Sequence, residues 1–83
     1  SRVLLTQADV KDAAAPAITL LEIVAKTGLV PSKSEGRRLI VQGGVELDEQ
    51  KMIDPNAVVT LSPGRQYRLR VGRKKFAVAE YRS

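Results

Sequence analysis

The side chains of this sequence that are best suited to chemistry are cations that follow a helix-capping serine. Ser32 stands directly before Lys33, and Arg37 comes one helical turn after Lys33 with Arg38 beside it. The first turn of a helix has free backbone N–H groups and the positive end of the helix dipole, which together attract anions. An arginine guanidinium can also hold two phosphate oxygens at once. The spacing therefore predicts an anion-binding helix edge with three cations.

A second group of basic residues lies near the end of the sequence. Residues 65–82 carry seven cations and one anion, whereas residues 1–31 carry three of each sign. Arg68 and Arg70 alternate with apolar residues, so we expect both on one face of a strand, followed by a basic hairpin connection. This uneven charge favours a polyanionic partner for the last two-thirds of the chain. The alternative is a solvated basic surface that keeps the domain soluble.

Two short helices are expected to position the first group. Thr19 and Glu22 form a capping-box pattern at the start of the first helix, and Gly28 is expected to end that helix in the left-handed conformation. Ser32 and Glu35 repeat the capping-box pattern at the start of a second helix that runs to about residue 42. The turn between the helices is short, so we expect them to pack as a hairpin.

The second helix is expected to have a buried and a basic face. Gly36, Leu39 and Ile40 fall within one arc at 100° per residue, and the cations fall on roughly the opposite arc. Val41 lies among the cations and does not fit this division. The alternative for the basic face is an ordinary solvated surface, with some cations paired to a neighbouring carboxylate. Gly43-Gly44 is expected to end the helix.

Beyond residue 44 the apolar period changes to two. A tight turn is expected at Asp48-Glu49, and on the last strand Phe76 and Val78 are expected to share the inner face. We therefore expect an α+β fold, in which a helical hairpin packs on a small, bent antiparallel sheet of four to five strands. The expected strands are residues 45–47, 51–53, 57–61, 66–71 and 76–81.

The composition excludes several classes of site. The sequence holds no cysteine and no histidine, which removes disulfides, the usual zinc sites and thiol nucleophiles. Asp48 and Glu49 are adjacent carboxylates at a surface turn, and Gly43-Gly44 lacks the spacing of a phosphate loop. We expect no catalysis by this chain, no metal and no cofactor. No apolar run approaches the roughly 18 residues of a membrane span and no signal peptide is visible. The absence of cysteine fits a cytoplasmic protein.

Residues 28–45 carry a resemblance to a known family. Their sequence is Gly-Leu-Val-Pro-Ser-Lys-Ser-Glu-Gly-Arg-Arg-Leu-Ile-Val-Gln-Gly-Gly-Val, which resembles the S-four-like RNA-binding domain, of alpha-L fold. The usual form of that family is Ser-(Lys/Arg)-Ser-Glu-Ala-Arg-Arg-Leu-Ile, followed by Gly before a strand. Gly36 stands here for the usual Ala, and Asp48-Glu49 stands for a frequent Asn-Gly turn.

Three features narrow the resemblance to one group of host proteins. The lead-in at residues 28–32, the double glycine at 43–44 and the late strand pair around residues 72–76 together resemble the C-terminal domain of the bacterial-type tyrosyl-tRNA synthetase family. The resemblance implies a tRNA-binding domain that grips tyrosine tRNA by its long variable arm and anticodon stem. A catalytic domain, absent here, would then aminoacylate that tRNA. Signatures of the HIGH and KMSKS type are missing from this sequence, so the chain itself should not activate tyrosine.

The same resemblance implies a domain division and a parent enzyme. Residues 1–17 would be a linker or junction with a preceding catalytic domain, and residues 18–83 the RNA-binding domain. Because the sequence begins at Ser1 and not at Met, we expect a fragment of a longer protein. The parent would be an ATP-dependent tyrosine–tRNA ligase that forms a homodimer, and this fragment a monomer.

The expected RNA contacts are phosphate and shape contacts rather than base-by-base recognition. Two hydroxyls would donate hydrogen bonds at the helix start, one amide would reach a ribose or base edge, and the basic residues would contact phosphates. The expected set is Ser32, Lys33, Ser34, Arg37, Arg38, Gln42, Arg68, Arg70, Arg73, Lys74 and Lys75. Two alternatives stay open: an rRNA-binding domain of a pseudouridine synthase or ribosome-associated protein, and a protein-interaction module whose sheet docks on an acidic partner.

Overall fold

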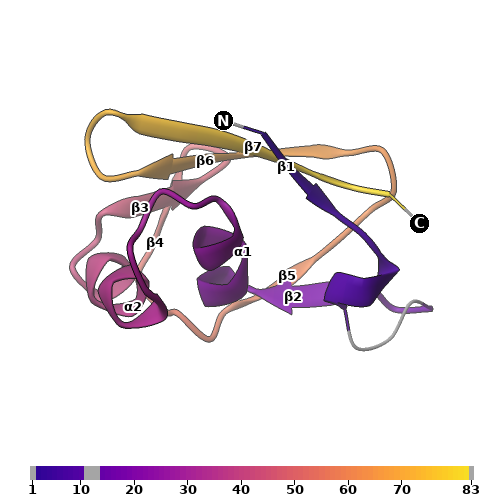
Figure 1. The fold of residues 1–83 in the computed structure, drawn as a ribbon, viewed down its shortest axis with the longest axis horizontal. Coiled ribbons are helices and arrows are strands. Elements are labelled where there is room, and N and C mark those ends of the chain that lie inside the picture. Colours follow the sequence, from indigo (N-terminus) through magenta and orange to yellow (C-terminus); the bar gives the residue numbers. More distant parts are fainter. Residues whose placement is uncertain (1, 11–13, 83) are drawn as a thin grey trace.

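Short strands and two helices build the fold, which a computed structural model describes for residues 2–10 and 14–82. Five strands form one sheet in the order β1-β7-β6-β3-β4, and β2 pairs with β5 in a second, small sheet. Figure 1 shows both helices on one side of the five-stranded sheet. The elements are β1 (Arg2–Leu5), the 3₁₀ helix η1 (Gln7–Asp9), β2 (Ala17–Thr19), α1 (Leu20–Lys26), α2 (Lys33–Val41), β3 (Val45–Leu47), β4 (Gln50–Met52), β5 (Val58–Thr60), β6 (Gln66–Val71) and β7 (Lys75–Tyr81).

The two helices begin at the predicted caps. The hydroxyl oxygen of Thr19 accepts a hydrogen bond from the Glu22 N–H, and that of Ser32 accepts one from the Glu35 N–H. Each bond satisfies one backbone donor that has no partner within the helix. In a complete capping box at the start of α1, the Glu22 carboxylate would also accept a hydrogen bond from the Thr19 N–H. It accepts one from the Lys33 ammonium instead. That contact joins α1 to the start of α2, and the two helices pack as the predicted hairpin.

Glycines end both helices in the left-handed conformation. Gly28 follows α1 with a φ of +71°, as the sequence predicts, and Gly43 follows the C-cap Gln42 of α2 with a φ of +80°. Gly44 comes next and is needed for space, since a Cβ atom there would lie 2.5 Å from Cδ1 of Leu39. The double glycine therefore lets the chain turn sharply from α2 into β3, and it serves as the predicted helix stop.

The turn between β3 and β4 has an unusual composition. Asp48 and Glu49 are its two central residues, and their φ angles are +50° and +71°. A two-residue hairpin turn with both φ angles positive favours Asn and Gly, because other side chains are strained there. A carboxylate oxygen of Asp48 accepts the backbone N–H of Arg68 at 2.9 Å, which ties the turn to β6. The tight turn is thus confirmed with acidic residues in it.

The residues that the sequence predicts for the inner face of the sheet are buried on β6 but not on β7. Tyr67, Leu69 and Val71 are buried as predicted. Phe76 and Val78 were expected inside, but the Phe76 side chain is 62% exposed and Val78 is half-buried. The cause is the pairing register, which sets the inward Leu69 opposite Ala77 on β7, so that the alternate residues of β7 face inward. The buried residues of β7 are Ala77, Ala79 and Tyr81.

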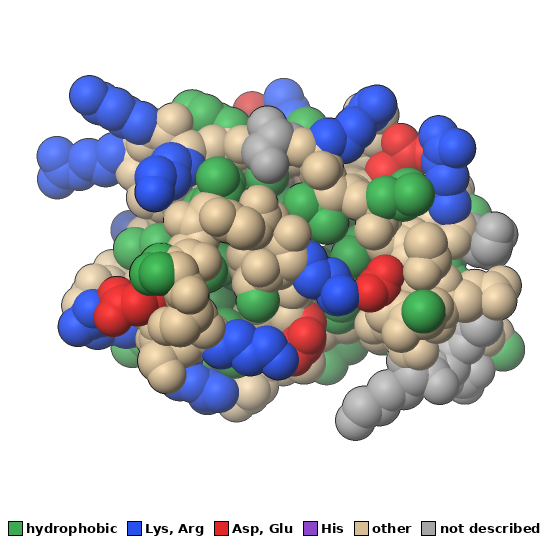
Figure 2. Space-filling model, viewed as in Figure 1, with side chains coloured by type: hydrophobic (Ala, Val, Ile, Leu, Met, Phe, Trp, Pro, Cys, Tyr) green, Lys and Arg blue, Asp and Glu red, His purple; other side chains and the backbone are tan. Residues whose placement is uncertain are grey.

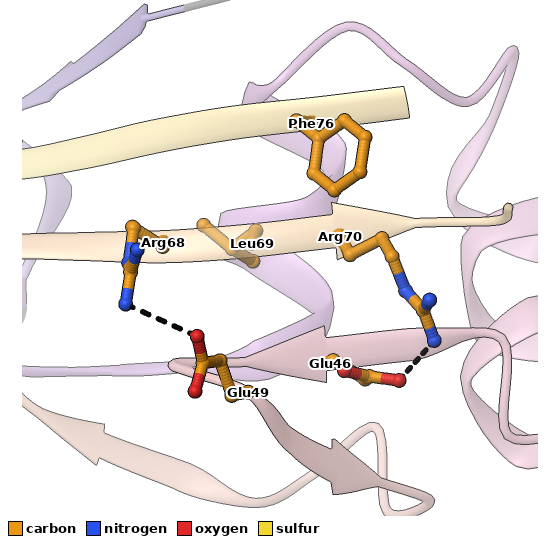
Figure 3. A pocket seen from close by; sticks show the side chains of 6 residues that line it. All are labelled: Glu46, Glu49, Arg68, Leu69, Arg70 and Phe76. Atoms are coloured by element: carbon orange, nitrogen blue, oxygen red, sulfur yellow. Dashed lines mark hydrogen bonds and ion pairs between the residues drawn. The ribbon is translucent and has the colours of Figure 1, made fainter. Parts of the chain in front are cut away.

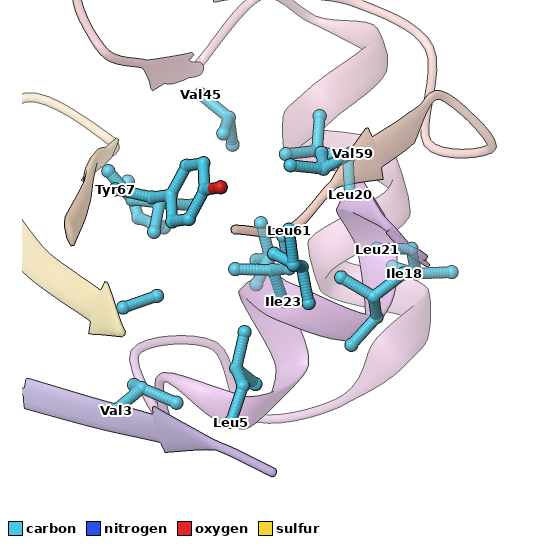
Figure 4. Packing of buried hydrophobic residues seen from close by; sticks show 14 of the residues in the cluster. Val3, Leu5, Ile18, Leu20, Leu21, Ile23, Val45, Val59, Leu61 and Tyr67 are labelled. Carbon is cyan, nitrogen blue, oxygen red and sulfur yellow. The ribbon is translucent and has the colours of Figure 1, made fainter. Parts of the chain in front are cut away.

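The predicted α+β fold is confirmed, with two differences in the sheet. The strand expected at residues 57–61 is β5, which pairs with β2 in the small second sheet and does not join the five-stranded sheet. The fifth strand of the five-stranded sheet is β1, which lies parallel to β7, so the sheet is mixed rather than wholly antiparallel. Val3 and Leu5 of β1 are buried, and their side chains join the cluster that includes Ile23 of α1 and Tyr67 of β6 (Figure 4). Residues 2–5 therefore have a place in the core, while the division of the chain at residues 1–17 stays a prediction.

Candidate nucleic-acid interface

The α2 edge has the two faces that the sequence predicts. Ile40 is fully buried and Gly36 is buried against α1, whereas Lys33, Arg37 and Arg38 are exposed. Val41 is 59% exposed beside them, so the one residue that did not fit the division lies on the solvent side. The division follows from the helix period alone, because the apolar residues of α2 have only one direction in which to reach the core. Ser32, Ser34 and Gln42 are also exposed on α2 or at its two ends.

Two of the three α2 cations already have an acidic partner. Nζ of Lys33 lies 2.6 Å from Oε1 of Glu22, and Arg38 donates to the carboxylate of Glu35. The hydrogen bond and charge of Glu35 raise the pKa of the Arg38 guanidinium above its ordinary value. Within the described part of the chain, Arg37 makes no ion pair. Exposed ion pairs contribute only about 0–1 kcal/mol, so Lys33 and Arg38 can exchange a carboxylate for a phosphate at little cost.

The second basic group lies beside the first in space. The loop of residues 72–74 joins β6 to β7, and Arg73, Lys74 and Lys75 are exposed there. Nζ of Lys75 lies 3.5 Å from the carbonyl oxygen of Leu29, in the loop that precedes α2. Figure 2 shows Lys and Arg side chains gathered at the end of the molecule that holds α2 and the β6–β7 connection. Two segments more than thirty residues apart thus form one basic end.

A groove separates these two basic segments. One hollow is lined by residues of α2, including Arg38 and Gln42, and the other by residues 71–75. Both hollows share Leu29 and Leu39, which pack on the core from its edge and stay half-buried. The two hollows are therefore adjacent, and we call them together the α2–hairpin groove. The sequence patterns did not indicate Leu29 and Leu39 as groove residues, and the only signal for Leu29 was that it is an apolar residue outside both expected helices.

Arg68 and Arg70 lie apart from this groove, on the outer face of the five-stranded sheet. Arg70 forms an ion pair with Glu46, and the Arg68 guanidinium lies 3.5 Å from a carboxylate oxygen of Glu49 (Figure 3). Glu46 stands opposite Arg70 in the pairing of β3 with β6. The charges of both arginines are therefore balanced locally, that of Arg70 by strand β3 and that of Arg68 by the β3–β4 turn. Their predicted RNA contacts stay a prediction, and the structure does not join them to the basic end.

The acidic side chains of the described residues pair with basic side chains or backbone N–H groups. Asp48 accepts from the backbone of Arg68 and pairs with Arg65, and the hydrogen bond from Lys26 is the main cause that lowers the pKa of Asp9. Among residues 2–10 and 14–82 no three carboxylates are close enough to hold a metal ion. In the same ranges no helix is long and apolar enough to cross a bilayer.

Comparisons with known proteins give a family and a set of relatives. The family model described as the S4 domain matches residues 19–63. A tyrosine–tRNA ligase of Clostridium botulinum (strain Alaska E43 / Type E3) is 61% identical over 36 residues, which are 43% of this chain and 9% of that protein. The tyrosine–tRNA ligase of Symbiobacterium thermophilum is 40% identical over 72 residues (82% of this chain, 17% of that protein), and that of Moorella thermoacetica is 40% identical over 60 residues (72% and 14%). The chain thus spans at most 17% of the length of these relatives. The two resemblances inferred from the sequence, to the S-four-like RNA-binding domain and to the tyrosyl-tRNA synthetase family, are thus confirmed.

Proposed function

The chain belongs to the S4 domain family, and from this premise we propose that it is an RNA-binding module. The RNA lies across the basic end, where α2 and the β6–β7 connection approach each other. The observation that carries this proposal is the contact of Lys75 with the carbonyl of Leu29, which merges two basic segments into one surface. A single cationic helix edge is common on soluble proteins, whereas two converging cationic segments match the spread of charge along a nucleic-acid backbone.

The charges at this end favour a polyanion even after the internal ion pairs are counted. Six cations face two carboxylates, those of Glu22 and Glu35. Arg37, Arg73 and Lys74 make no ion pair within the described residues, so they can contact phosphates without breaking an existing bond. The six cations are Lys33, Arg37, Arg38, Arg73, Lys74 and Lys75.

The finer part of the proposal concerns which RNA is bound. We propose that the RNA is tyrosine tRNA, held at its long variable arm and anticodon stem, and that the parent protein is an ATP-dependent tyrosine–tRNA ligase. Its support is that the relatives are tyrosine–tRNA ligases and that residues 28–47 and 72–76 resemble that family. Catalysis belongs to the parent, which we propose is a homodimer, and this chain is a monomer. A cytoplasmic location is part of the proposal, because cysteine is absent from the sequence.

A binding titration with three RNAs tests the proposal. Fluorescence anisotropy would compare tyrosine tRNA, a tRNA with a short variable arm and an rRNA hairpin at the same low salt concentration. We expect the tightest binding to tyrosine tRNA, because the proposed contacts are to its long variable arm, which the short-arm tRNA lacks. Tighter binding of the rRNA hairpin would assign the domain to an rRNA-binding protein. No binding to any of the three RNAs would contradict RNA binding itself.

A further inference from the structure

The floor of the α2–hairpin groove differs in character from its rim. Leu29 and Leu39 line both hollows, and we call their apolar surface the groove floor. Val71 of β6 lines the second hollow beside them. The two hollows have a volume of about 300 Å³ each, at the lower limit of the roughly 300–1,000 Å³ of ligand pockets. A phosphate gains nothing from an aliphatic floor, because burying a charge there removes its hydration. The floor therefore suits a small, flat, apolar group attached to a charged backbone.

The rim supplies charge and hydrogen bonds on both sides of that floor. Arg38 and Gln42 stand on the α2 side, and Arg73, Lys74 and Lys75 stand on the β6–β7 side. The Gln42 amide carries both a donor and an acceptor, and no other neutral amide side chain lines the groove in the described part of the chain. Glu35 lines the same hollow and pairs with Arg38, so the α2 rim offers a cation to a phosphate only when that ion pair opens, whereas the β6–β7 rim carries three cations.

We propose that this groove holds the base of one unpaired nucleotide, an inference that rests on the RNA binding proposed above. The base lies on Leu29 and Leu39, where it displaces water from an apolar surface. The Gln42 amide meets an edge of the base, and the Arg38 guanidinium can lie along its face. Arg73 and Lys74 contact the phosphates that flank the nucleotide.

The geometry selects an unpaired nucleotide over a paired one. A base within an A-form helix is stacked and paired, and its deep, narrow major groove keeps side chains away from it. A base in a bulge, a loop or a strand end has no such partners, so moving it onto the groove floor costs little. The preferred ligand is therefore an RNA stem that carries a single unpaired nucleotide beside its phosphates.

Three matched RNA hairpins test this inference on the 83-residue chain. The first is fully paired, the second carries one bulged adenosine, and the third carries an abasic nucleotide at the same bulge. The abasic RNA keeps the phosphate and the flexible backbone but lacks the base. We expect the bulged RNA to bind about tenfold more tightly than the abasic RNA in fluorescence anisotropy. This factor is near the low end of the affinity that one stacked base contributes, because the groove floor is aliphatic and not aromatic.

A substitution in the floor adds a second, independent comparison. Leu29→Gln places an amide on the groove floor, and Leu4→Gln makes the same change on β1, where Leu4 is 56% exposed on the sheet. We expect Leu29→Gln to bind bulged and abasic RNA equally and Leu4→Gln to keep the tenfold preference. Circular dichroism would verify that both variants fold. If Leu29→Gln does not fold, Gln42→Ala replaces it. We expect Gln42→Ala to reduce the logarithm of the affinity ratio between bulged and abasic RNA by at least half.

The outcomes separate this inference from the RNA binding on which it rests. Equal affinity of the wild-type chain for bulged and abasic RNA, with both bound, would overturn the base site and leave phosphate recognition intact. Absence of binding to all three hairpins at low salt would overturn both proposals. A preference for the bulged RNA that persists in folded Leu29→Gln would place the base elsewhere on the surface and also overturn the groove site.

Discussion

Arg37 is the α2 cation whose removal should be easiest to interpret. It is exposed and makes no ion pair within the described residues, so Arg37→Ala breaks no bond in the free protein. One phosphate contact releases about 0.7–0.9 counterions. Its contribution to the association constant is therefore about five- to eightfold larger at 0.1 M salt than at 1 M salt. We therefore expect Arg37→Ala to weaken RNA binding about five- to eightfold at 0.1 M salt and to leave the free energy of unfolding within about 0.5 kcal/mol of wild type.

A matched variant separates this local contact from the overall charge. Arg82→Ala removes the same formal charge from the far end of the fold, where Arg82 is exposed and pairs with Glu80. Its effect on affinity should stay below about twofold, because charges more than a Debye length (about 10 Å at 0.1 M salt) from the RNA are largely screened. Fluorescence anisotropy would measure both affinities and urea unfolding both stabilities. Equal weakening by the two variants would refute the α2 contact and attribute binding to net charge alone.

Three further predictions concern the ion pairs and one helix contact. Glu35→Gln should free Arg38 and tighten RNA binding by up to about fivefold, since an exposed pair is worth at most about 1 kcal/mol; unchanged or weaker binding by anisotropy would contradict it. Gly36→Ala should raise the free energy of unfolding by about 0.5–1 kcal/mol in urea, because a Cβ atom there would meet no atom closer than 3.4 Å; a loss of stability would mean that the helices pack too closely for it. Asp9→Asn should destabilise the fold at pH 7 but not at about pH 2. Lys26 holds the pKa of Asp9 below its ordinary value, so the contribution of the ionised carboxylate is fully present above that ordinary value and is lost as the pH falls through the lower pKa of the folded state. Equal destabilisation at both pH values in urea unfolding would argue against that ion pair.

The helices could be predicted because their signals are local. Thr19 and Ser32 cap within three residues of the N–H groups that they accept from, and Gly28 ends α1 by its own conformation. The faces of α2 follow from its period, so the exposed positions of Arg37 and its neighbours were predicted correctly. None of these features depends on how a distant part of the chain folds.

The features that the sequence did not predict depend on pairing between distant segments. Phe76 was assigned to the wrong face of β7 because its orientation is set by its pairing with Arg70 across the β6–β7 hairpin, not by its hydrophobicity. Strand β1 joins β7 across almost the whole chain, and four residues carry too weak a pattern to predict that partner. The groove likewise needs Lys75 to reach Leu29 across 46 positions. Local periodicity holds no information about such contacts.

The central claim is that the basic end of the domain binds RNA through phosphates, and the salt dependence of binding tests it most directly. If about four to six phosphates are engaged by the six cations of α2 and the β6–β7 connection, the logarithm of the association constant for tyrosine tRNA should fall with the logarithm of salt concentration with a slope of roughly −3 to −5. Arg37→Ala should make that slope shallower by about one unit. Tight binding that does not change with salt would contradict the account.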